Sequence, residues 1–189
     1  MVRWIGNLVL IFSFAAGACS PNLLAQAKPG LTLTTTSFED GGIIPDKYTQ
    51  AAQGTPVSPQ LSWTNVPEGT VSFTLMVLDP DTSVNKTTTE ILHWMVFNIP
   101  ASVRELPEGV PATPKLDNGA IQAKSQRGAV GYLGMGARAP GPYHHYTFEL
   151  FALDTKLNLG PDAPQADVLK AMDGHVLMKG VLVGRFHRP

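Results

Sequence analysis

Carboxylate and imidazole side chains stand where two apolar runs of the sequence end. Asp79 and Asp81 follow the run Val71–Leu78, and His93 directly precedes the run Trp94–Ile99. Both runs are short and rich in β-branched and aromatic residues, which predicts two buried strands joined by a polar loop. We expect the loop to fold back and bring carboxylates and imidazole to one end of a sheet. Because such groups tune each other's pKa, acid–base catalysis is one interpretation.

The stretch HHY supplies a second set of candidates. On a strand, His144 and Tyr146 share one face, whereas His145 points to the other. The stretch follows a glycine-rich segment, Gly131–Gly136, whose backbone N–H groups are able to surround a small anion. Binding without turnover is therefore a second interpretation, in which the carboxylates orient the donors.

Other chemistries lack their usual signals. No H-x-x-x-H spacing supports a metal site, no G-x-S-x-G supports a serine hydrolase, and we predict no cofactor. The formal net charge is −1 and no cluster of lysine and arginine is evident, which argues against nucleic acid as a partner.

The first 27 residues are typical of an export signal. A short apolar run, Ile5–Ala18, precedes the sequence AQA at 25–27, which has the form that signal peptidase cleaves. An alternative is a lipoprotein signal over 1–18, after which Cys19, the only cysteine, would be acylated. The run is too short for a membrane span. We expect a protein exported to the periplasm or cell envelope, or secreted, with a lipid anchor as the alternative.

Residues 31–187 are predicted to form one mainly β domain. Apolar residues make up 43% of the chain and charged residues 15%, which suits a globular core. Besides the two central runs, we predict strands at Leu31–Thr34, Leu61–Trp63, His145–Asp154 and Val176–Phe186.

The segment between the last two strands predicts one short helix. Asp162 is expected to cap it, Gly174 to end it, and an apolar stripe of Ala166, Leu169 and Met172 to pack against the core. In the last strand we expect Gly180 and Gly184 to mark bulges.

Four motifs in order resemble the phosphatidylethanolamine-binding protein (PEBP) family, and its bacterial Raf-kinase-inhibitor-like branch looks most similar. They are SPQLSW at 58–63, DPD at 79–81, HW followed by NIP within 93–100, and GY, GP and HHY within 131–146. Their order and spacing agree over residues 31–186, which is nearly the whole of the expected mature chain.

This resemblance implies an antiparallel β-sandwich with Greek-key connections and one short helix. It also implies a shallow anion pocket and no enzymatic activity. The partner would be a small anionic or phosphorylated ligand. The alternative is inhibition or regulation of a protease or other envelope protein through surface loops. Carried over residue by residue, the ligand-binding positions are Asp79, Asp81, His93, Gly134, His144 and Tyr146.

Overall fold

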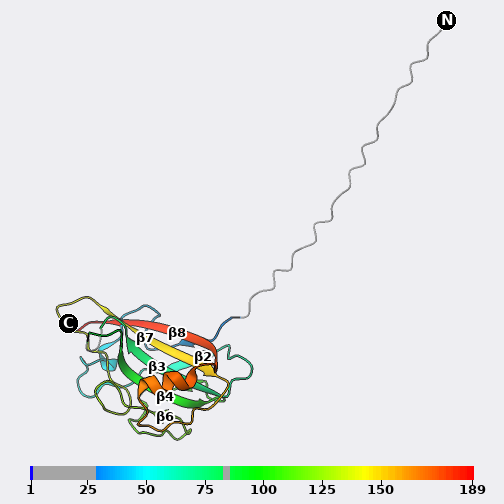
Figure 1. Cartoon of the computed structure of the whole chain (residues 1–189). Coiled ribbons are helices and arrows are strands. Elements are labelled where there is room, and N and C mark those ends of the chain that lie inside the picture. The colour runs from blue at the N-terminus through cyan, green and yellow to red at the C-terminus, as the bar shows by residue number, and fades with distance from the viewer. Residues whose placement is uncertain (2–28, 83–85) are drawn as a thin grey trace.

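Two antiparallel sheets form the domain (Figure 1). The computed structural model describes Met1 and residues 29–82 and 86–189, so the predicted export signal and Cys19 lie outside the described residues, apart from Met1. The smaller sheet has the order β1-β2-β5 and the larger one β6-β4-β3-β7-β8. The strands are β1 (Thr32–Thr34), β2 (Leu61–Thr64), β3 (Ser72–Asp79), β4 (Ile91–Pro100), β5 (Glu105–Leu106), β6 (Ile121–Gln122), β7 (His144–Leu153) and β8 (Val176–Phe186).

The predicted mainly β architecture is confirmed, and β3 shows why these residues form it. All eight residues of β3 are buried, because each face of the strand packs against a different layer. Phe73, Leu75 and Val77 point toward the smaller sheet, and Met76 and Leu78 belong to the core cluster on the opposite face. Side chains that alternate on a strand thus serve two separate cores.

The central hairpin positions the polar ends of its strands. In the antiparallel pair of β3 with β4, Asp79 lies opposite Ile91, two residues before His93. On its other side β3 pairs with β7, and Leu78 lies opposite Thr147 near the start of that strand. The end of β3 therefore meets the start of β7 at one end of the larger sheet.

The helix α1 (Gln165–Met172) lies across the larger sheet (Figure 1), but two details of its prediction are wrong. Asp162 does not cap it: the N-cap is Pro164, without a side-chain cap, and the carboxylate of Asp162 instead pairs with Lys124 at 2.7 Å.

Within the described part of the chain, no helix is long and apolar enough to span a membrane.

The buried stripe of α1 also differs from the prediction. Val168 and Met172, four residues apart, are the buried positions, whereas Leu169 is 41% exposed and Ala166 is exposed too. Only Met172 was placed correctly. In a helix this short, the packing of the neighbouring sheet decides which stripe is buried.

Gly180 and Gly184 are not bulges, which corrects the prediction for β8. Both pair regularly with β7, and the register shift lies instead next to Leu153. A Cβ atom at Gly180 would lie 2.7 Å from the carbonyl oxygen of Leu31, and one at Gly184 would lie 2.5 Å from Cγ1 of Ile44. These glycines allow the N-terminal segments to pack closely on β8.

Candidate ligand-binding site

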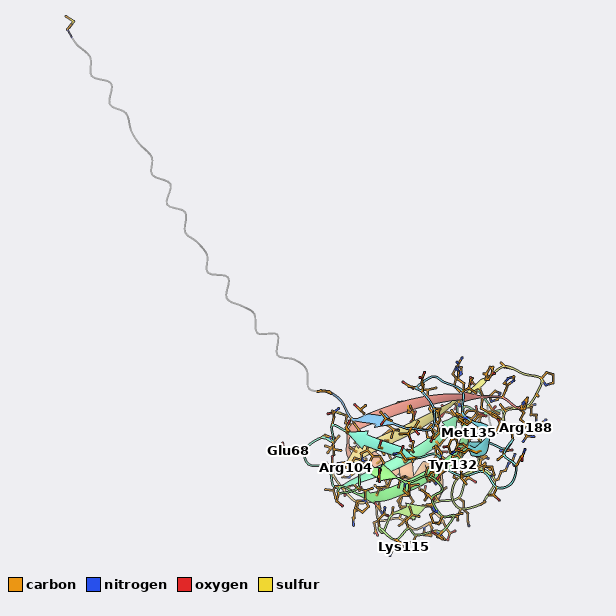
Figure 2. All side chains as sticks on the ribbon, turned by 180° about the vertical axis from the view of Figure 1, so that it is seen from behind. Glu68, Arg104, Lys115, Tyr132, Met135 and Arg188 are labelled. Atoms are coloured by element: carbon orange, nitrogen blue, oxygen red, sulfur yellow. The ribbon has the colours of Figure 1, made fainter. Side chains whose placement is uncertain are left out.

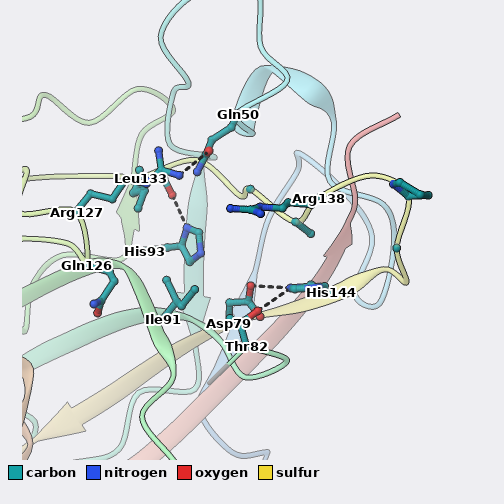
Figure 3. A pocket seen from close by; sticks show the side chains of 14 residues that line it. Gln50, Asp79, Thr82, Ile91, His93, Gln126, Arg127, Leu133, Arg138 and His144 are labelled. Carbon is teal, nitrogen blue, oxygen red and sulfur yellow. Dashed lines mark hydrogen bonds and ion pairs between the residues drawn. The ribbon is translucent and has the colours of Figure 1, made fainter. Parts of the chain in front are cut away.

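A pocket of about 510 Å³ opens where β3 ends, β4 begins and β7 begins (Figure 3). Three of the six predicted site residues line it, namely Asp79, His93 and His144. The glycine-rich segment predicted to lie beside them forms another wall. The remaining lining residues are Gln50, Thr82, Ile91, Gln126, Arg127, Leu133, Gly136, Ala137, Arg138, Pro140 and Gly141.

Asp79 and His144 form a hydrogen-bonded pair in this pocket. Oδ2 of Asp79 lies 2.9 Å from Nδ1 of His144, and the carboxylate is almost completely buried while the imidazole is 20% exposed. The other oxygen, Oδ1, accepts the backbone N–H of Asp81 at 3.0 Å. The hydroxyl of Thr82 lies 3.3 Å from the same imidazole nitrogen. This arrangement fixes the ring and leaves its Nε2 free of the carboxylate.

His93 is an imidazole without a carboxylate partner. It is 3% exposed, and its Nδ1 donates to the carbonyl oxygen of Leu133 at 2.9 Å. Burial lowers the pKa of His93, and this effect outweighs the opposing effects of the Leu133 carbonyl and of the charge on Asp79. The ring is therefore neutral at pH 7, and its Nε2 is a hydrogen-bond acceptor.

Tyr146 lies beneath the pocket and does not line it. Its side chain is fully buried, and its ring meets the His93 ring edge-on with centroids 5.2 Å apart. The hydroxyl accepts the backbone N–H of Ala137 at 3.1 Å. Burial, together with the nearby charge of Asp79, raises the pKa of Tyr146 to about 12. The phenol is thus a neutral support for the pocket.

Asp81 also lies outside the pocket lining. Its Oδ2 accepts both the backbone N–H and, at 2.9 Å, the Nδ1–H of His145. The backbone N–H of His145 is the main cause that lowers the pKa of Asp81, and both side chains of this pair are exposed. The second aspartate of DPD therefore fastens the loop after β3 to the start of β7.

Gly134 stands behind the pocket wall. Its carbonyl oxygen accepts the side-chain amide of Gln50 at 2.9 Å. A Cβ atom here would lie 2.7 Å from Cβ of Pro56 and 2.9 Å from the carbonyl carbon of Thr49. Only glycine allows this close contact, so the position shapes the wall without touching the pocket.

Sequence reasoning missed the cationic side of the site. Arg127 and Arg138 line the pocket together with Gln50, whose side-chain oxygen accepts Nη2 of Arg127 at 3.1 Å (Figure 3). Both arginines belong to the glycine-rich stretch 123–142, and their presence in that stretch was the available signal. The pocket thus combines guanidinium donors with the acceptors Asp79 and Nε2 of His93.

A mainly β domain with a pocket of mixed polarity at a sheet end is a typical scaffold for binding a small molecule. The sequence profile of the phosphatidylethanolamine-binding protein family matches residues 34–187, and the chain belongs to this family. The resemblance seen in the four motifs is therefore confirmed.

Relatives with similar sequences occur in archaea and bacteria. A UPF0098 protein of Methanothermobacter thermautotrophicus is 41% identical over 158 residues, which cover 84% of this chain and 99% of that protein. The UPF0098 protein YbcL of Escherichia coli is 34% identical, covering 80% of this chain and 79% of YbcL. These names state no enzymatic activity, and members of the family are generally binding proteins.

Two solved structures share the fold. The crystal structure of E. coli YbcL superimposes with a TM-score of 0.75 at 28% identity, covering 85% of this chain and 100% of that one. A PEBP homologue from Chlamydia trachomatis gives a TM-score of 0.72 at 32% identity, covering 85% of this chain and 99% of the other.

Proposed function

We propose that this protein is an exported, non-catalytic binding protein that takes a small anionic or phosphorylated ligand into the pocket between Asp79, His93 and His144. The observation that carries the proposal is the convergence of two imidazoles and two guanidinium groups on one pocket. The family is called after phosphatidylethanolamine, a lipid whose head group contains a phosphate. This agrees with the proposed ligand class.

The hydrogen-bonding capacity of the pocket matches a monoprotonated phosphate. Neutral His93 accepts at Nε2 and is therefore suited to the P–OH group. Arg127 and Arg138 donate to the charged oxygens, and guanidinium groups bind phosphate well because their N–H groups match its geometry. Asp79 holds Nδ1 of His144, so Nε2 of that ring remains available to the ligand.

Calorimetric titration tests this function with inorganic phosphate and a panel of phosphate-bearing head groups. We expect heat with the wild-type protein and at least about a tenfold loss of affinity in His93→Ala and in His144→Ala. His145→Ala is the matched control, because it removes the same chemical group from the exposed pair outside the pocket. Absence of heat with the whole panel, or an equal loss in the control, would contradict the proposal.

Export rests on the sequence of residues 1–27 and needs a separate experiment. Mass measurement of the protein isolated from its native host identifies the mature N-terminus. We expect a free Lys28 after cleavage at AQA, or an acylated Cys19 if the lipoprotein signal is used. A chain that still begins at Met1 would contradict export.

A further inference from the structure

Two arginines bond to the side chain of Gln50 at the mouth of the pocket, and a third arginine lines the same pocket. Oε1 of Gln50 accepts Nη2 of Arg127 at 3.1 Å and Nη2 of Arg188 at 2.9 Å, so two guanidinium groups share one amide oxygen. Arg138 belongs to the same pocket lining as Gln50. All three arginine side chains are exposed.

The backbone holds Arg188 in this position. Its N–H donates to the carbonyl oxygen of Ala137 at 3.1 Å, and Ala137 lines the pocket. The ring of the preceding residue, His187, contacts the ring of Tyr143 in a tilted arrangement, with centroids 4.0 Å apart. The segment after β8 is therefore fixed against the pocket wall.

These arginines differ in their partners from three lysines of the domain. Lys47, Lys124 and Lys179 each pair with a carboxylate at 2.7–2.8 Å. Within residues 29–82 and 86–189, none of the ion pairs includes an arginine. The positive charges of Arg127 and Arg188 thus lie close together, separated only by the uncharged amide of Gln50. A bound anion would stabilise this arrangement.

We propose that Arg127, Arg138 and Arg188 form a second anion subsite at the mouth of the pocket. The inference rests on the proposed function and specifies its ligand class: a small molecule with two neighbouring anionic groups, for which pyrophosphate is the simplest probe. The group beside His93 and His144 also accepts hydrogen bonds from Arg127 and Arg138, and the second group lies between these two arginines and Arg188.

The donor capacity of the subsite supports this ligand class. Each guanidinium has five N–H groups, and Gln50 accepts only one from Arg127 and one from Arg188. The remaining N–H groups can bind a phosphoryl group through paired hydrogen bonds. The second anionic group also offsets the mutual repulsion of the arginines, so it adds affinity that a single phosphate cannot supply.

Calorimetry with orthophosphate and pyrophosphate tests the inference at low ionic strength. We expect wild-type protein to bind pyrophosphate at least about tenfold more tightly than orthophosphate. Arg188→Gln should lower the pyrophosphate affinity about tenfold and the orthophosphate affinity less, so that the ratio of the two falls. Arg104→Gln is the control, because Arg104 bonds to backbone carbonyl groups and lies far from Arg188 (Figure 2).

The possible results separate the two proposals. Orthophosphate binding without a preference for pyrophosphate would overturn the second subsite and leave the proposed function standing. An equal effect of Arg188→Gln and Arg104→Gln on pyrophosphate would also overturn it, since a general loss of positive charge would then explain the change. Absence of binding by either anion would overturn the second subsite, and the proposed function would fall with it only if the whole panel of phosphate-bearing head groups also gave no heat.

Discussion

Two aspartate–histidine pairs with the same chemistry lie next to each other in this protein and differ in their surroundings. Asp79–His144 and Asp81–His145 each have an Oδ2–Nδ1 distance of 2.9 Å. The side chains of the first pair are 4% and 20% exposed, and those of the second are 39% and 53% exposed. The first pair lines the pocket, whereas the second fastens a loop.

The difference shows that burial, rather than residue type or distance, separates a candidate site from a surface contact. When an exposed carboxylate is removed, water can hydrogen-bond to the groups it leaves behind. Water does not reach the groups left behind by a buried carboxylate. The inner pair should therefore matter more for stability and for ligand binding than the outer pair. Four predictions test this comparison, beginning with the largest effect.

Removal of the two carboxylates should have unequal consequences. Asp79→Ala leaves Nδ1 of His144 and the backbone N–H of Asp81 without their acceptor, and we expect the free energy of unfolding to fall by about 2–4 kcal/mol. Asp81→Ala should cost less than about 1 kcal/mol. Urea denaturation at pH 7 measures both, and equal losses would show that burial does not separate the pairs.

The hydroxyl of Tyr146 supports the inner pair from below. Tyr146→Phe leaves the buried N–H of Ala137 without an acceptor, which should lower the free energy of unfolding by about 1–2 kcal/mol. Tyr143→Phe, at an exposed ring, is the matched control and should change stability by less than about 0.5 kcal/mol. If Tyr146→Phe left the free energy of unfolding unchanged, water would have to reach the backbone N–H of Ala137.

His93 adds a buried imidazole without a carboxylate to the comparison. Its pKa is lowered in the folded state, so the unfolded chain, with a value near 6.5, binds the proton first as the pH falls. The free energy of unfolding should therefore decrease as the pH falls through 6.5, by at most about 1.4 kcal/mol per pH unit.

The variant His93→Asn keeps a donor for the carbonyl of Leu133 and removes the titration. The difference between wild type and variant, measured by urea denaturation at pH 7.5, 6.5 and 5.5, isolates the contribution of this residue. If the free energies of unfolding of the two proteins changed with pH in parallel, the lowered pKa of His93 would be contradicted.

The outer pair should give the smallest effect, and only in acid. The lowered pKa of Asp81 means that its stabilising contribution is present above 3.8 and is lost as the pH falls through the lower folded value. Asp81→Asn should make the acid-induced loss of stability slightly shallower between pH 5 and pH 3. An effect as large as that of Asp79→Ala at pH 7 would contradict the surface role of this carboxylate.

Long apolar runs made most of the fold predictable. Val71–Leu78 became β3 with a shift of one residue at each end, and β8 begins and ends as predicted at Val176 and Phe186. Both faces of β3 are covered, whereas the fully buried residues of β8 all lie on one face, at Gly180, Leu182, Gly184 and Phe186. The short helix was less predictable, since Val168 and Leu169 are adjacent and only the neighbouring sheet selects which one is buried.

The site was predictable where strand geometry determines it and unpredictable where loops do. Alternation along β7 correctly separated His144 from His145. The pairing of Asp81 with His145 depends on the path of the loop after β3, for which the sequence has no periodic signal. Arg188 reaches Gln50 only because the chain after β8 folds toward Ala137.

The alternation of β7 also constrains how this protein can change during evolution. A one-residue insertion ahead of the strand would exchange the two histidines, but it would equally turn Phe148 and Leu150 out of the core. Such an exchange would disrupt the packing of the core to which Phe148 and Leu150 belong. The residues that keep the protein folded therefore also determine which imidazole faces the pocket.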